Sequence, residues 1–227
     1  MSFGLFTAIG GFISTVATKI GPILSTAANI IATKLPVVLE NASVIVSAIS
    51  NVVTKVSEML DIVPQEENPE EIGAKTIQEG TRAKGPEETT QEYLDYLRTE
   101  VPLDRERFER MSEEEKMGCE IIGDTMLAKS IEEKTGVELP SEFLLTIPQA
   151  KLQCETVLAL IKAFSDAGIS SLNEYTRYIS NDMSESEASV VGDAIKSAIQ
   201  ETSPEMTPEE IQREVITMKQ EYNTEKN

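Results

Sequence analysis

Histidine and tryptophan are absent from this 227-residue chain, and cysteine occurs only twice. Without histidine, the chain cannot form a Ser-His-Asp triad or a Cys/His zinc site. Cys119 and Cys154 are too few for a disulfide framework or a four-ligand metal site. Basic residues are also scarce, because 20 Lys and Arg stand against 39 Asp and Glu, a formal net charge of −19. Binding to a phosphate backbone needs clustered basic residues, so the sequence predicts no nucleic-acid partner.

Motifs for catalysis or cofactor binding are missing too: the chain has no glycine-rich phosphate loop and no nucleophile elbow. Glu113, Glu114 and Glu115 fit acids of a first helical turn, where the helix dipole favours them. Glu120 and Asp124 have the i, i+4 spacing of carboxylate metal ligands, but without a histidine partner we interpret them as a solvated helix face. We therefore predict a non-enzymatic protein with no catalytic residue, no metal site and no cofactor.

The acidic charge is confined to one part of the chain. Residues 1–63 hold three bases and three acids, whereas residues 64–227 hold 17 bases and 36 acids. The change falls at Pro64, where an acidic run with two prolines begins that cannot bury apolar surface. We predict an all-α fold in four parts. These are apolar membrane-active or oligomerising helices (1–63), an acidic Pro/Gly linker with room for a short helix (64–86), a compact acidic multi-helix domain (87–222), and a disordered tail (223–227).

The first apolar segment combines bulky side chains with glycines, and Gly21-Pro22 ends it. Its bulky residues follow helical spacing along one stripe, opposite a thin side made by glycines. A wedge of this shape fits shallow insertion into a membrane interface. The predicted membrane-interacting residues are Phe3, Leu5, Phe6, Ile9, Phe12, Ile13, Val16 and Ile20.

Within this segment, residues Gly4 to Ile13 resemble class I viral fusion peptides, particularly the influenza hemagglutinin type that begins with Gly-Leu-Phe. The resemblance covers about ten residues, and we interpret it as convergence on one physical solution. It implies membrane affinity for this segment, and we do not extend it to fusion activity.

A second apolar pattern runs from Leu24 to Val63 in alternating steps of four and three, which is a heptad seam. The opposite face carries small hydroxylated and amide side chains, which are tolerated in membranes and at close helix contacts. The seam therefore fits a membrane-embedded helix or a soluble bundle that buries the seam against itself. The predicted helix-seam residues are Leu24, Ile31, Leu35, Val38, Ile45, Ile49, Val52, Val56 and Met59.

The acidic part carries a series of capping-box signals, in which a Ser or Thr precedes a Glu by three residues. The five pairs are Thr89/Glu92, Ser112/Glu115, Ser171/Glu174, Ser184/Glu187 and Thr207/Glu210. With the apolar periodicity they predict helices over 70–79, 88–99, 103–110, 112–134, 148–167, 171–180, 184–201 and 207–222. We expect 148–167 to be the central helix and both Val190 and Val191 to be core residues. Cys119 and Cys154 fall on different helices and are expected as free thiols, with a bridge between them as the alternative.

These patterns predict a membrane-interacting protein: a delivered effector, a pore-forming subunit, or a packaged component of a phage-like or secretion apparatus. The apolar region would engage a membrane or a hydrophobic conduit, and the acidic domain would dock to a protein partner. The alternative is a soluble structural assembly protein, a homo-oligomer formed through the N-terminal heptads. No basic region precedes the first apolar run, so we expect a membrane-associated, secreted or delivered protein without a cleaved signal peptide, or alternatively a cytoplasmic one.

Overall fold

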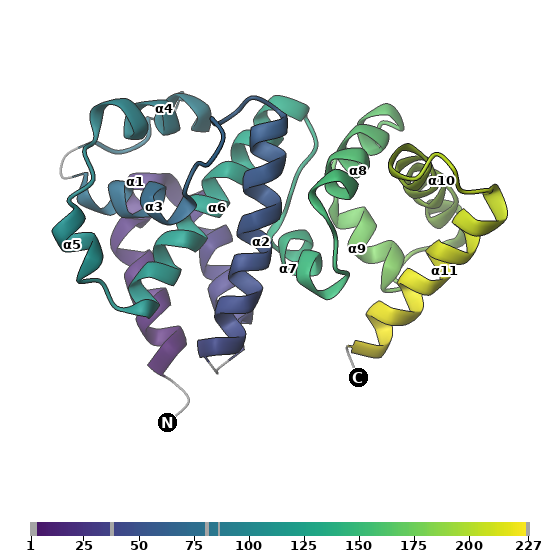
Figure 1. Ribbon diagram of the computed structural model, residues 1–227, viewed down its shortest axis with the longest axis horizontal. Helices are drawn as coiled ribbons and strands as arrows, with labels where there is room; N and C mark the ends of the chain where they lie inside the picture. Colours follow the sequence, from purple (N-terminus) through teal and green to yellow (C-terminus); the bar gives the residue numbers. More distant parts are fainter. Residues whose placement is uncertain (1–3, 37–38, 80–81, 86, 226–227) are drawn as a thin grey trace. The chain divides into compact units, whose positions relative to one another are not determined.

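The computed structural model describes residues 4–36, 39–79, 82–85 and 87–225. It confirms the all-α class, since among these residues the one β-type pairing is an isolated bridge between Glu138 and Ser171. The chain forms two compact units, Met1–Glu133 (unit 1) and Lys134–Asn227 (unit 2) (Figure 1). The helices are α1 (Gly4–Lys34), α2 (Leu39–Met59), α3 (Pro69–Gln78), α4 (Thr90–Glu100), α5 (Arg105–Glu109), α6 (Glu113–Thr135), α7 (Ser141–Gln149), α8 (Cys154–Asp166), α9 (Asn173–Ile179), α10 (Glu185–Thr202) and α11 (Pro208–Glu225).

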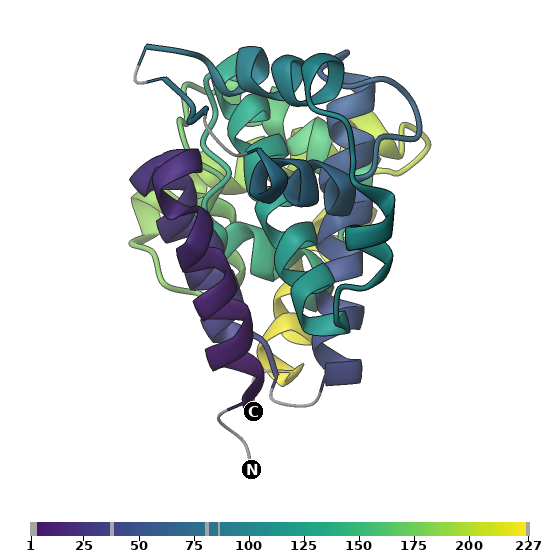
Figure 2. The same ribbon diagram turned by 90° about the vertical axis from the view of Figure 1, so that its left-hand side faces the viewer.

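Helix α1 consists of two arms that meet at Gly21. This glycine has φ 81° and ψ 164°, a backbone conformation that side chains with a Cβ rarely adopt. Pro22 follows as the first residue of the second arm, a position that suits its fixed φ and missing N–H. The chain turns back there, and the second arm returns toward the end where the first began (Figure 2). The break expected at Gly21-Pro22 is therefore present.

Glycines bring α3 into direct contact with α6. A Cβ added to Gly73 would lie 2.0 Å from the carbonyl oxygen of Cys119, and one added to Gly123 would lie 2.1 Å from that of Pro69. Both distances are far below any van der Waals contact, so the two backbones cross where neither has a side chain. Ile72, Ala74 and Thr76 of α3 are buried in this packing.

The predicted helix starts match the structure at most positions. Complete capping boxes form at Thr89/Glu92 and Ser184/Glu187. Both reciprocal bonds also join Ser112 to Glu115 and Thr207 to Glu210. The pair Ser171/Glu174 is the exception, because α9 starts after Leu172 and the Ser171 hydroxyl accepts the N–H of Asn173.

Unit 2 packs α10 against α8, α9 and α11, and α9 against α7. Its interior includes Phe143 and Tyr175, whose rings meet edge to face with centroids 6.0 Å apart. Two expectations fail here. The predicted helix 148–167 is two helices, because Pro148 lies near the end of α7 rather than at a start. Val190 is 54% exposed, so of the pair only Val191 belongs to the core.

The division into units differs from the expected boundary at residues 64–86. The short helix expected over 70–79 is present as α3, and α3 packs against both α1 and α4. The boundary between units instead follows Glu133, inside the predicted domain 87–222. Charge and hydropathy do change at Pro64, but the apolar face of α3 joins the acidic helices to the N-terminal ones.

Candidate functional site

Three residues of the predicted membrane-interacting stripe of α1 lie in the core of unit 1. Ile9, Ile13 and Ile20 are 0–2% exposed, and Phe12 is half-buried. Leu5, Phe6 and Val16 belong to α1, but their side chains are outside the described part of the structure, and Phe3 lies outside the described residues. The three isoleucines and Phe12 therefore pack within unit 1, and the outer side of the first arm carries small residues such as Ser14 and Thr15.

The first arm of α1 is held in place by both apolar packing and hydrogen bonds. A Cβ added to Gly118 of α6 would lie 2.5 Å from Phe12 Cδ1, so the Phe12 ring rests directly on the α6 backbone. The Lys84 N–H donates to the Lys19 carbonyl at 2.8 Å, and the Lys19 ammonium donates to the Ile77 carbonyl at 3.3 Å. These contacts tie the arm to α6, to α3 and to the segment that precedes α4.

The predicted heptad seam is divided between the second arm of α1 and α2. Most of its members are buried inside unit 1, but Ile45 is half-buried and Met59 is 46% exposed. Val38 lies outside the described residues. The buried members are Leu24, Ile31, Leu35, Ile49, Val52 and Val56.

The α2–α6 contact contains carboxyl groups where an apolar core would be expected. Asp124 is 1% exposed, so its interpretation as part of a solvated face is wrong. Ser50 of α2 lies beside the carboxyl groups of both Asp124 and Glu120. Among the described residues the Asp124 Oδ1 atom has no hydrogen-bond partner, and neither do the buried hydroxyls of Thr54 and Ser57 on α2.

Burial raises the pKa of these carboxyl groups. For Asp124, desolvation raises the pKa well above its ordinary 3.8, Glu120 raises it further, and Ser50 opposes the shift. Desolvation also raises the pKa of Glu120 and of Glu70. These three carboxyl groups, Asp124, Glu120 and Glu70, form a cluster that takes up protons more readily than exposed carboxylates do.

The chemistry open to this cluster is limited. Across the described ranges, no group of three or more His, Cys, Asp or Glu residues is arranged to hold a metal ion. Of the three carboxyl groups, Asp124 is buried, and Glu120 and Glu70 are half-buried. The sequence signal that could have revealed the burial of Asp124 is its position, between Ile121-Ile122 and Met126-Leu127 on a helix with apolar residues on most sides.

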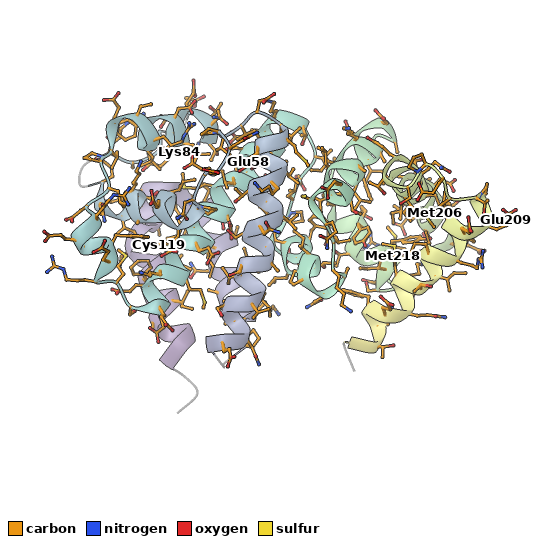
Figure 3. The ribbon with its side chains drawn as sticks, in the orientation of Figure 1. Glu58, Lys84, Cys119, Met206, Glu209 and Met218 are labelled. Carbon is orange, nitrogen blue, oxygen red and sulfur yellow. The ribbon has the colours of Figure 1, made fainter. Side chains whose placement is uncertain are left out.

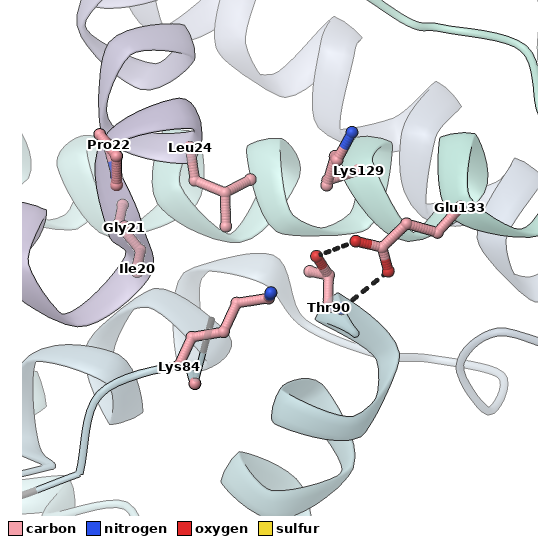
Figure 4. Close-up of a pocket in the computed structure, with 9 residues that line it drawn as sticks. Ile20, Gly21, Pro22, Leu24, Lys84, Thr90, Lys129 and Glu133 are labelled. Carbon is pink, nitrogen blue, oxygen red and sulfur yellow. Dashed lines mark hydrogen bonds between the residues drawn. The ribbon is translucent and has the colours of Figure 1, made fainter. Parts of the chain in front are cut away.

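A pocket of about 300 Å³ lies beside the turn of α1 (Figure 4). One wall is the apolar corner Ile20 to Leu24, and both of these end residues are buried. The facing residues come from the segment before α4, from the start of α4 and from the last turns of α6. These lining residues are Lys84, Gly85, Thr90, Lys129 and Glu133.

Comparisons of this chain with protein families, curated proteins and solved structures found no match. Among the described residues, no helix combines the length and the apolar character that crossing a bilayer requires.

Proposed function

We propose that this chain is a non-enzymatic protein that stores a membrane-interacting helix, the first arm of α1, within unit 1. The observation that carries the proposal is that the apolar segment at the start of the chain is a helix folded onto α6, with Ile9, Ile13 and Ile20 of its stripe buried. A wedge kept in this way is protected from water until a membrane offers it another apolar surface.

The corner at Gly21 supports a movement of the first arm alone. The helical hydrogen-bond pattern is already broken there, so rotation about one glycine could move the first arm without unwinding the second. The first arm also holds a single charged residue, Lys19, beside the corner. A lysine at the end of an inserting helix can keep its ammonium group in the interface.

Release of the first arm exposes its apolar side chains, and insertion into a membrane buries them again. Burial of Ile9, Ile13 and Ile20 contributes roughly 5–9 kcal/mol in all, taking about 1.5–3 kcal/mol for each side chain. The same side chains regain a similar free energy when they enter lipid, so the two states can lie close together. An acid substitution such as Ile9→Glu is a poor test, because it would damage the core as well as insertion.

A disulfide between the first arm and α6 tests the proposal without this ambiguity. In Phe12→Cys/Gly118→Cys, the ring that blocks residue 118 is removed. The Cβ at 118 would lie 3.5 Å from the native Phe12 Cγ position, which puts the two Cβ atoms within reach of the roughly 3.5–4.5 Å that a disulfide needs. Cys119→Ala and Cys154→Ala prevent wrong pairing. We expect the reduced protein to float with phosphatidylcholine vesicles and the oxidised protein to remain unbound.

The single variant Phe12→Cys in the same background, treated with the same oxidant and reductant, is the matched control and should float under both conditions. Equal flotation of the oxidised and reduced double variant would show that the arm need not move. If the reduced protein and the control both fail to float, membrane interaction itself is refuted.

We also propose that unit 2 provides the docking surface for a protein partner. It holds 16 acids and eight bases, with Val190 and Ile216 exposed on α10 and α11. A pull-down that compares wild-type unit 2 with its Val190→Ser/Ile216→Ser variant would test this proposal. Capture of the same protein in the same amount by both would refute it. Assembly through the heptad seam receives less support, because its buried members already pack within unit 1.

A further inference from the structure

We infer that the pocket beside the turn of α1 binds a single aliphatic chain with an anionic head, namely a free medium-chain carboxylate. This inference does not rest on the proposed membrane function, because it concerns the folded protein with the first arm of α1 docked and needs no release of that arm. It rests on the shape of the pocket, on its apolar wall, and on the polar partners of the groups that face that wall.

The apolar surface for the chain is that of Pro22, which is exposed in the pocket lining. Ile20 and Leu24, on either side of the Gly21-Pro22 corner, are 2% and 4% exposed and lie beneath it. The volume of about 300 Å³ is at the lower end of the range for ligand sites, roughly 300–1,000 Å³. A diacyl lipid would not fit, so the occupant is a single-chain molecule.

Lys84 supplies the charge for the head group. Its backbone N–H is fixed by the Lys19 carbonyl, and its side chain extends toward Leu24 and Thr90 (Figure 4). The Lys84 ammonium donates to the Glu88 carbonyl and forms no ion pair with an acid in the described part of the chain. An ammonium has three N–H donors, so Lys84 can also bind a carboxylate.

The carboxylate that lines the pocket, Glu133, already accepts two hydrogen bonds. The two oxygens of Glu133 accept from the N–H and the hydroxyl of Thr90, at 2.7 and 2.8 Å. Lys129, one turn before Glu133 on α6, pairs with Glu132 at 2.7 Å. Glu133 points at Thr90 rather than at Lys84 (Figure 4), and of the two lysines that line the pocket only Lys129 forms an ion pair within the described part of the chain.

Isothermal titration of the full chain with decanoate, below its micelle concentration, tests the inference. Decanol and decyltrimethylammonium have the same chain with a neutral and a cationic head. We expect decanoate to bind once per chain and more tightly than either. Lys84→Gln should weaken decanoate binding by about tenfold or more, the loss of one charge-assisted hydrogen bond. Lys34→Gln, the same change at an exposed site on α1, should have less than a twofold effect.

Lys84→Arg keeps the charge and should restore decanoate binding, which separates the head-group contact from any general effect on folding. Decanol that binds as tightly as decanoate, or decanoate that binds Lys84→Gln as tightly as wild type, would overturn the inference. So would uptake without saturation at one molecule per chain. Decanoate should still bind the oxidised Phe12→Cys/Gly118→Cys protein, so this result is independent of vesicle flotation.

Discussion

Replacement of Asp124 by asparagine should stabilise unit 1, and the gain should grow with pH. The side chain is fully buried between α2 and α6, and its Oδ1 has no partner among the described residues. Asparagine keeps the shape, removes the ionisable group and adds two N–H donors that can reach Ser50 and Glu120. At pH 8 the wild type must either ionise a buried carboxyl group or hold its proton against the solvent pH, and asparagine removes this cost. We expect Asp124→Asn to gain about 1–3 kcal/mol at pH 8, the size of the cost of a buried polar group without a partner.

The sign of the pH dependence follows from the raised pKa of Asp124. A carboxyl group whose pKa is raised in the folded state binds its proton more tightly there than in the unfolded chain. Its contribution to stability is complete below the ordinary value of 3.8 and is lost as the pH rises through the folded-state pKa. The wild type and Asp124→Asn should therefore differ little at pH 3.5 and diverge toward pH 8.

Urea denaturation at a series of pH values, followed by circular dichroism, measures this divergence. Asp95→Asn is the matched control, because the Asp95 carboxylate is 53% exposed and pairs with Arg98 at the surface. It should change the free energy of unfolding by no more than about 0.5 kcal/mol at any pH. A loss of stability in Asp124→Asn that is the same at pH 3.5 and pH 8 would refute the argument.

Five further outcomes are expected. Because the raised pKa values of Asp124, Glu120 and Glu70 make acid strengthen the packing of unit 1, vesicle flotation should be greater at pH 8 than at pH 5, and the opposite order would contradict this linkage. Gly123→Ala should destabilise unit 1 by at least about 1–3 kcal/mol on thermal melting, since its Cβ meets the Pro69 carbonyl. Gly11→Ala, with open space around the Cβ, should be neutral or stabilising. Ser184→Ala should cost unit 2 about 1 kcal/mol through the lost cap of α10, and an unchanged melt would show that the cap is dispensable. In thiol labelling Cys154 should react first, because Cys119, labelled in Figure 3, is buried with a raised pKa; equal rates would contradict its burial.

The helices could be predicted from the sequence because their ends are marked by local chemistry. Gly21-Pro22 and the capping pair Thr89/Glu92 specify local backbone geometry within a few residues, and the structure confirms both. Pro148 misled the prediction because proline is tolerated near either end of a short helix, and only the neighbouring packing decides which end it occupies.

The packing of the site could not be predicted in the same way. The stripe from Ile9 to Ile20 is equally suited to lipid and to a protein core, and periodicity does not say which surface covers it. The burial of Asp124 depends on Ser50, which is more than 70 residues earlier and reaches it only after α2 and α6 pack. The pocket likewise joins the α1 corner to Lys84 and Glu133, three segments that no local pattern connects.

The distance between the first arm of α1 and α2 on a membrane tests the stored-helix proposal most directly. Spin labels at Ser14→Cys and Asn51→Cys, both exposed in unit 1, would report this distance in a Cys119→Ala/Cys154→Ala background. A second pair at Asn51→Cys and Glu106→Cys, on α2 and α5, is the control for movement elsewhere in unit 1. On binding to phosphatidylcholine vesicles, we predict that the 14–51 distance increases while the 51–106 distance stays the same. An unchanged 14–51 distance in vesicle-bound protein would contradict release of the first arm.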